Sequence, residues 1–325
     1  MIRLIVCFCG LSAAVAIAAD GRLAVNDKLV PEGRKDLLVI QDALTGVLAK
    51  CRAATVCIEI GEGSGSGVIV SKDGLVLTAA HVSGRVGKKV KVKLEDGTEL
   101  AAVTLGLVAD SDAAMIRITD EGEYPFVEID RDDSLRLGDW VFSLGHSGGF
   151  DEKRGSVVRL GRLVRIANAT LQSDCTLIGG DSGGPLFDLS GRLVAIHSRV
   201  GQQLQVNMHV PMKIYLDNWE GMMGSEFLGE GPFAQKPVKG SGYLGIATEA
   251  AEDGGIRVTK VGRNSPALEA GIKLGDVILT MNETAVRSRD ELRELLKELA
   301  AGDEVVLEVR RDGELKTLTF ELGER

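Results

Sequence analysis

Ser182 is the residue best placed for chemistry, because glycine pairs flank it in a stretch that matches neither a strand nor a helix. Glycine inside a regular element costs conformational entropy without adding packing contacts. A tight turn that exposes a hydroxyl beside free backbone N–H groups would use these glycines, and acyl-transfer enzymes hold a developing oxyanion in this way. An ordinary surface loop is the alternative interpretation. The stretch is Gly179-Gly180-Asp181-Ser182-Gly183-Gly184-Pro185-Leu186.

A histidine and an aspartate precede this serine in the chain. His81 follows the strand-like run 75–78 and two alanines, and Asp112 precedes the apolar run 114–118. A serine hydroxyl is a weak nucleophile at its own pKa, so it needs a neighbouring base. An imidazole can take the hydroxyl proton, and a buried carboxylate can hold that imidazole in the required tautomer. The order His, Asp, Ser therefore favours nucleophilic catalysis over a simple loop.

The composition limits the class of protein. The chain has 325 residues, a net charge of -9 and dispersed Lys and Arg, so nucleic acid is not an expected partner. Residues 1–19 combine a basic residue, an apolar run and small residues before Asp20, which predicts a cleaved signal peptide and an exported protein. An uncleaved N-terminal anchor is the alternative.

Three cysteines remain after residue 19: Cys51, Cys57 and Cys175. At most one disulfide can form among three cysteines of one chain. None has the spacing of a metal ligand pair, so they are expected to be structural or free. Nothing else in the sequence indicates a metal or an organic cofactor.

The elements that would position these residues are mostly strands. Residues 34–51 predict an amphipathic helix, and residues 55–216 then give many short β-rich runs separated by turns, which predicts a β-barrel or double barrel. Residues 213–223 predict a closing helix, and the Gly- and Pro-containing residues 224–242 a linker. Residues 243–322 alternate strand-like and helical segments, as in a separate α/β unit.

Four motifs in this order resemble the trypsin-like serine proteases, and the C-terminal unit resembles a PDZ domain. The protease motifs are Gly65-Ser66-Gly67-Val68-Ile69, Leu77-Thr78-Ala79-Ala80-His81-Val82, Asp112-Ala113-Ala114 and Gly180-Asp181-Ser182-Gly183-Gly184-Pro185-Leu186. The PDZ motifs are Tyr243-Leu244-Gly245-Ile246 and residues 264–278. Together they resemble the HtrA (Deg) family of exported proteases, which implies a chymotrypsin-like double β-barrel followed by a small α/β PDZ domain.

The resemblance also predicts domain boundaries. A signal peptide covers residues 1–19, an N-terminal segment with the amphipathic helix covers 20–53, and the protease domain covers 54–224. A linker over 225–240 then leads to a PDZ domain over 241–323.

In this family layout His81, Asp112 and Ser182 are the catalytic triad. Asp112 is preferred over Asp110 and Asp174, because only Asp112 stands in the Asp-Ala-Ala context of the family. The backbone N–H groups of Gly180 and Ser182, with that of Asp181 if the turn is tight, would form the oxyanion hole.

The residues expected to line the S1 pocket are Thr176, His197 and Arg199. Members of the HtrA family usually accept small aliphatic P1 residues. A histidine in an Ile-His-Ser context instead resembles the glutamate-specific bacterial proteases, so an acidic P1 residue is the second hypothesis. A histidine bonded within the sheet is the third interpretation.

The segment Tyr243, Leu244, Gly245 and Ile246 predicts a loop that leads into an edge strand. An extended peptide can add to such an edge while loop amides hold its terminal carboxylate. We therefore expect an exported, cofactor-independent serine endopeptidase whose partners are protein substrates and PDZ peptide ligands. A homo-oligomer is possible, although the N-terminus lacks the aromatic residues that often join family trimers. A catalytically inactive adaptor or chaperone, and a hydrolase of non-peptide esters, remain the alternatives.

Overall fold

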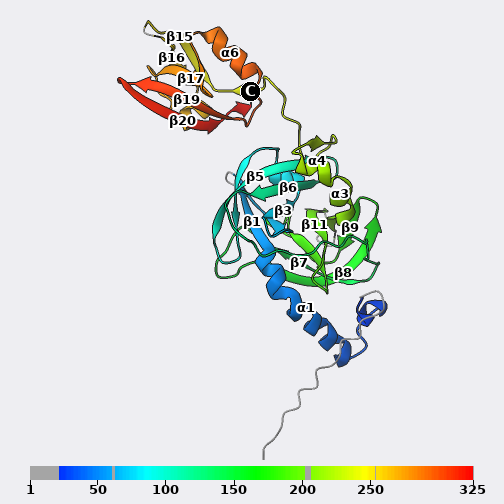
Figure 1. Ribbon diagram of the computed structural model, residues 1–325. Coiled ribbons are helices and arrows are strands. Elements are labelled where there is room, and N and C mark those ends of the chain that lie inside the picture. The colour runs from blue at the N-terminus through cyan, green and yellow to red at the C-terminus, as the bar shows by residue number, and fades with distance from the viewer. Residues whose placement is uncertain (1–21, 61–62, 202–205, 253, 325) are drawn as a thin grey trace, which may run out of the picture. The chain divides into compact units, whose positions relative to one another are not determined.

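The computed structural model describes residues 22–60, 63–201, 206–252 and 254–324, and the chain divides into two compact units after Gln235 (Figure 1). The predicted signal peptide lies outside the described residues. Among the helices of the described ranges, none is long and apolar enough to span a membrane.

Six strands of the first unit close into an N-terminal barrel, in the order β5, β4, β1, β2, β3, β6, with β6 pairing back onto β5. Alternate strand residues face the barrel interior, and those that do so here are mostly aliphatic. The short β-rich runs predicted from the sequence over 55–60, 67–70, 75–78, 90–94 and 114–118 correspond to the other five strands, whereas no run was predicted over β5. The strands are β1 (Thr55–Ile60), β2 (Gly63–Ile69), β3 (Leu75–Thr78), β4 (Lys89–Lys93), β5 (Glu99–Val108) and β6 (Ala113–Ile118).

Six more strands form a second closed barrel, in the order β10, β11, β12, β9, β8, β7. The double barrel predicted from the sequence is therefore confirmed. No β-rich run was predicted over β9. The strands are β7 (Trp140–Gly145), β8 (Val157–Ala167), β9 (Thr170–Ser173), β10 (Pro185–Asp188), β11 (Leu193–Val200) and β12 (Asn207–Pro211).

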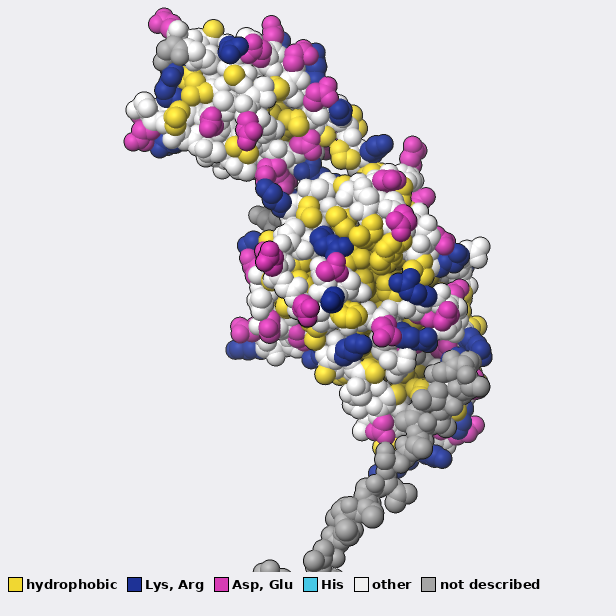
Figure 2. All heavy atoms as spheres, viewed as in Figure 1, with side chains coloured by type: hydrophobic (Ala, Val, Ile, Leu, Met, Phe, Trp, Pro, Cys, Tyr) yellow, Lys and Arg dark blue, Asp and Glu magenta, His cyan; other side chains and the backbone are white. Residues whose placement is uncertain are grey.

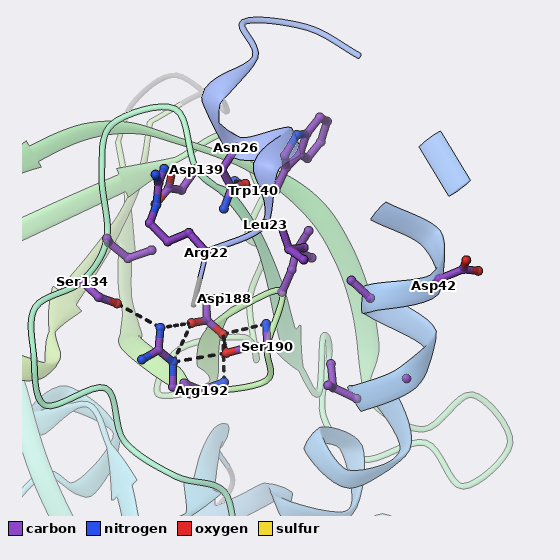
Figure 3. A pocket seen from close by; sticks show the side chains of 15 residues that line it. Arg22, Leu23, Asn26, Asp42, Ser134, Asp139, Trp140, Asp188, Ser190 and Arg192 are labelled. Atoms are coloured by element: carbon purple, nitrogen blue, oxygen red, sulfur yellow. Dashed lines mark hydrogen bonds and ion pairs between the residues drawn. The ribbon is translucent and has the colours of Figure 1, made fainter. Parts of the chain in front are cut away.

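The N-terminal segment packs beside the second barrel. Helix α1 (Arg34–Ala54), predicted over 34–51, follows a short 3-10 helix η1 (Ala24–Asp27). Arg22 forms ion pairs with Asp27 and Asp139. A cavity of about 340 Å³ lies between this segment, α1 and the barrel (Figure 3). At its rim Arg192 bonds to Asp188, whose carboxylate is 2.9 Å away.

The end of the first unit differs from the prediction. The helix expected over 213–223 is two short helices, α3 (Met212–Asp217) and α4 (Trp219–Met223), which meet at Asn218. Part of the expected linker over 225–240 also packs on the first barrel, because β13 (Phe227–Leu228) pairs in parallel with β5. The apolar side chains of Phe227 and Phe233 explain this contact, since they pack against the buried cluster around Leu107.

The second unit is a small sheet with two helices. Strands β15 (Ile246–Ala250), β16 (Ile256–Val261), β17 (Val277–Met281), β19 (Glu304–Arg311) and β20 (Glu314–Glu321) form the sheet in that order, and β18 (Thr284–Ala285) pairs with β17. Helices α5 (Pro266–Glu269) and α6 (Arg289–Lys297) complete the unit, and β14 (Gly242–Tyr243) pairs with β21 (Gly323–Glu324). The hydroxyl of Ser288 caps α6 by accepting from the N–H of Glu291 at 3.1 Å.

Candidate active site

His81 and Asp112 form a hydrogen-bonded pair on the first barrel. His81 Nδ1 lies 2.9 Å from Asp112 Oδ1 and 3.0 Å from Oδ2, and the backbone N–H of His81 also donates to Oδ1 at 3.0 Å. The Asp112 side chain is fully buried, whereas the His81 side chain is 36% exposed. A buried carboxylate on Nδ1 directs the other ring nitrogen, Nε2, away from Asp112 with its lone pair free to accept a proton.

Local structure explains why these two residues meet. Strand β3 pairs with β6, and Thr78 at the end of β3 stands opposite Ala114. His81 then lies in the one-turn helix α2 (Ala80–Ser83), and Asp112 immediately precedes β6. Asp112 adopts a positive φ of 59°, which aspartate tolerates better than most residues.

The second barrel contributes two supports to this pair. Ser198 of β11 donates its hydroxyl to Asp112 Oδ2 at 2.5 Å. Tyr215 of α3 is fully buried and donates to the carbonyl of Thr78 at 2.6 Å, at the end of the strand that leads to His81. Burial raises the pKa of Tyr215 well above its ordinary value, so its hydroxyl remains a donor.

Ser182 shares a cleft with His81. The cleft has a volume of about 330 Å³ and is lined by both residues, by Gly180 and by residues of β2 and α2. The N–H of Ser66 on β2 donates to the carbonyl of Ser182 at 2.7 Å, which holds the serine turn of the second barrel against the first. Among the hydrogen bonds between described residues, none joins Ser182 Oγ to His81 Nε2. Such bonds are often long without substrate and shorten in the reacting complex.

Hydrogen bonds of the backbone around Ser182 fix the directions of the N–H groups of Gly180 and Ser182. The carbonyl of Gly179 accepts from Gly148 N–H at 2.7 Å, and the carbonyl of Asp181 accepts from Gly184 N–H at 2.9 Å. In a trans peptide the N–H points opposite to the C=O. The N–H groups of Gly180 and Ser182, which follow these carbonyls, therefore point away from Gly148 and Gly184.

Asp181 has a different environment from its two neighbours. Its N–H donates to the carbonyl of Ile178 at 3.1 Å, so this amide is occupied within the turn. Of the three backbone N–H groups predicted for the oxyanion hole, only those of Gly180 and Ser182 remain candidates. Gly180 has a φ of +94°, and a Cβ there would lie 2.4 Å from the carbonyl oxygen of His146, so only glycine fits.

The three side chains predicted for the S1 pocket do not line this cleft. Thr176 is exposed, and the guanidinium of Arg199 lies 5.0 Å from the ring centre of Phe233. His197 is fully buried and uses both ring nitrogens inside the barrel, with Nδ1 3.0 Å from His209 Nδ1 and Nε2 3.2 Å from the carbonyl of Leu144. Burial lowers the pKa of His197 to about 3, so the ring is neutral at pH 7.

The predicted peptide-binding segment lies at one edge of the second unit's sheet. Ile246 begins β15, which is the terminal strand in the sheet order. Gly245 has a φ of +84°, and its carbonyl accepts from Gly262 N–H at 2.7 Å. Tyr243 belongs to β14, and Leu244 is buried in the core of this unit, so Leu244 supports the loop from inside.

Comparison with known proteins agrees with this arrangement. Residues 65–196 match the family model of the trypsin-like peptidase domain, and residues 242–322 match that of the PDZ domain. Curated relatives include the probable periplasmic serine endoproteases DegP-like of Pseudomonas fulva, 30% identical over 80% of this chain, and of Pseudomonas fluorescens, 31% identical over 80%. The chain is similar to the HtrA/Deg-like proteases. It spans 55% and 56% of the length of these two relatives.

Solved structures share the fold of this HtrA-like chain. The serine endoprotease from Yersinia pestis aligns with a TM-score of 0.50 and 24% identity, over 91% of this chain and 99% of that one. The HtrA-type protease AlgW with tripeptide aligns with a TM-score of 0.50 and 24% identity, over 88% and 97%.

Sequence reasoning missed several residues that support the site of this HtrA-like chain. Ser198 bonds to Asp112, but it was noted only as a neighbour of His197. Arg159 on β8 lies 3.1 Å from the carboxylate of Asp181, and no sequence pattern links these two residues. The N–H of His146 donates to Ser66 Oγ, which in turn donates to the carbonyl of Gly180, both at 2.8 Å.

The charged side chains on one face and the three cysteines are further features of this HtrA-like chain. On the face shown in Figure 2, basic and acidic side chains are intermixed on both units. Within the described ranges no three His, Cys, Asp or Glu residues gather as metal ligands. Cys51, Cys57 and Cys175 are free and buried, and burial raises their pKa to about 12, 11 and 11.

Proposed function

We propose that this chain is an exported serine endopeptidase that cleaves proteins through an acyl-enzyme, with a PDZ domain that binds peptide segments. The observation that carries the proposal is the bonding of His81 Nδ1 to the buried Asp112 carboxylate while His81 and Ser182 line one cleft. The names of the relatives support the same reaction and a periplasmic location.

The reaction assigns one role to each residue. Ser182 Oγ attacks the scissile carbonyl carbon, and its proton passes to His81 Nε2. The carbonyl oxygen becomes an oxyanion that accepts from the N–H groups of Gly180 and Ser182. The C–N bond then breaks, and the protonated His81 gives its proton to the leaving amine. Water, deprotonated by His81, attacks the acyl carbon; the ester bond to Ser182 Oγ then breaks, His81 returns the proton to Oγ, and the acid is released. Asp112 holds the imidazole and stabilises its charged form.

A small aliphatic P1 residue fits this site better than an acidic one. His197 is buried, neutral and bonded on both nitrogens, so it offers no positive charge to a P1 carboxylate. A peptide panel that varies only P1 should show faster cleavage after Val or Ala than after Glu. Faster cleavage after Glu would restore the acidic hypothesis and require His197 to rotate.

The second unit supports a peptide-binding role. Among the strands of the described ranges β15 pairs only with β16, and α6 contacts β15, so an extended peptide can add to the open edge between β15 and α6. An inactive adaptor would use this edge alone. Assembly of several copies remains a prediction, which the mass in solution measures.

Degradation of an unfolded protein tests the proposal. Reduced, carboxymethylated lactalbumin should be cleaved by the wild type and left intact by Ser182→Ala. Ser190→Ala, on the exposed turn after β10, is the matched control and should cleave like the wild type. If the wild type and Ser182→Ala both leave the substrate intact while the PDZ domain still binds peptides, the chain is an adaptor.

A further inference from the structure

A second buried carboxylate lies beside the nucleophile. The Asp181 side chain is fully buried, although aspartate is costly to bury without partners. Ser147 donates its hydroxyl to Asp181 Oδ1 at 2.5 Å, and the N–H of Ile178 donates to Oδ2 at 2.9 Å. The remaining partner is a cation: Arg159 Nη1 lies 3.1 Å from Oδ2.

Arg159 is held in place by the second barrel. It lies on β8 opposite Ser143 of β7, and its side chain is only 19% exposed. Its Nη2 also donates to Ser147 Oγ at 2.9 Å. The guanidinium, the hydroxyl and the carboxylate therefore form a closed set of three contacts. None of these three side chains takes part in the proton transfers proposed for His81 and Ser182.

The position of Asp181 sets the direction of both predicted oxyanion donors. Asp181 stands between Gly180 and Ser182, and its N–H and C=O are bonded to Ile178 and Gly184. Its carboxylate also accepts from the N–H of Ile178, so a second hydrogen bond joins the two ends of the turn. A shift of the Asp181 carboxylate would therefore rotate the neighbouring peptides and change the direction of the N–H groups of Gly180 and Ser182, two residues that line the cleft.

We propose that Arg159 is a positioning residue for the oxyanion hole: by neutralising Asp181 it keeps the amides of Gly180 and Ser182 directed into the cleft. This inference rests on the proposed peptidase function. Without Arg159 the buried carboxylate loses the one cation that pairs with it among the described residues, which is strongly unfavourable. The turn then relaxes to expose the carboxylate to water.

Four proteins test the proposal: the wild type, Arg159→Gln, Arg159→Gln with Asp181→Asn, and Arg165→Gln. Arg165 is an exposed arginine on the same strand and serves as the matched control. Arg159→Gln should lower kcat for a peptide substrate by about 100-fold, as does loss of an oxyanion donor, with KM within about threefold. The double variant should recover at least about tenfold of that loss, because the asparagine oxygen can still accept from the Ile178 N–H while its NH₂ group donates to Ser147 Oγ, and no charge is buried.

Hydrogen exchange of the peptide segment around Ser182 gives a readout that does not need activity. Exchange there should be faster in Arg159→Gln than in the wild type and should slow again in the double variant. If Arg159→Gln does not fold, folding of the double variant supports the role of charge neutralisation. Failure of both to fold overturns it.

Unchanged kcat and unchanged exchange in Arg159→Gln would also overturn the inference, as would an equal loss in Arg165→Gln. If the wild type hydrolyses no peptide, the proposed function fails separately. Hydrogen exchange of the segment around Ser182, compared between the wild type and Arg159→Gln, then still decides whether Arg159 orders the turn.

Discussion

The substitution Asp112→Asn probes the centre of the proposed site. Three donors meet at the Asp112 carboxylate: the backbone N–H of His81, its ring Nδ1 and the hydroxyl of Ser198. An asparagine offers one acceptor oxygen and one NH₂ donor in the same volume. If the oxygen stays with the backbone N–H of His81, the NH₂ group faces Nδ1. The imidazole then accepts at Nδ1 and carries its proton on Nε2.

This tautomer cannot take a proton from Ser182, so the effect falls on the chemical step. The same change of tautomer lowers kcat by about 10⁴ in serine proteases of this type. At about 1.36 kcal/mol for each factor of ten, the barrier rises by about 5.4 kcal/mol. KM should change little, because Asp112 is fully buried and does not touch the substrate.

The assay is steady-state hydrolysis of a fluorogenic peptide by the wild type, Asp112→Asn and Asp110→Asn. Asp110 is the matched control, since it is an exposed aspartate two positions away whose carboxylate accepts from Ser111. Circular dichroism should show that all three proteins are folded. Retention of more than about a tenth of wild-type kcat in Asp112→Asn, or an equal loss in Asp110→Asn, would refute the assigned role.

Further predictions concern the turn, the buried histidines, the helix cap and a thiol. Gly180→Ala should lower kcat by about 10²–10³ because its Cβ would lie 2.4 Å from the His146 oxygen, whereas Gly179→Ala, with nothing within 4 Å, should stay near wild type in the same peptide assay. Burial lowers the pKa of His197 to about 3 and that of His209 well below its ordinary value, so the unfolded chain takes up protons that the folded chain does not. The free energy of unfolding should therefore fall as pH drops from about 6.5 towards 3, by at most about 1.4 kcal/mol per pH unit for each histidine. Urea unfolding at pH 7 and pH 5 measures this, and an equal pH dependence in His209→Gln would contradict it. Ser288→Ala should destabilise the PDZ domain by about 1 kcal/mol through loss of the cap on α6, which a lower Tm of that domain would show. Cys51, whose pKa burial raises to about 12, should resist iodoacetamide at pH 8 until the chain is unfolded in urea.

Local patterns in the sequence predicted most of the strands, and the resemblance to the protease family singled out Asp112. Strand β3 ends in small residues before His81, and an apolar run follows Asp112, but only the structure shows that these two strands pair. Strand β5 was missed because small residues interrupt its apolar alternation, as in Ala101-Ala102 and Gly106. The contact of Phe227 with the first barrel depends on a surface that forms only after folding.

The S1 side chains and the support of the oxyanion turn could not be predicted in the same way. A β-bulge shifts the register of β11 between His197 and Arg199, and Ser198 there bonds to Asp112. A bulge changes which face of a strand each side chain occupies, so strand alternation alone could not place His197. The pairing of Arg159 with Asp181 likewise depends on how β7 and β8 close the barrel.

Covalent labelling of Ser182 tests the proposed catalytic centre most directly. A fluorophosphonate probe should modify the wild type once, and mass spectrometry of the digested protein should locate the adduct on Ser182. Ser182→Ala should remain unlabelled, and Asp112→Asn should react far more slowly. An unlabelled wild type in the presence of peptide ligand, or an adduct on another residue, would contradict the assignment of His81, Asp112 and Ser182.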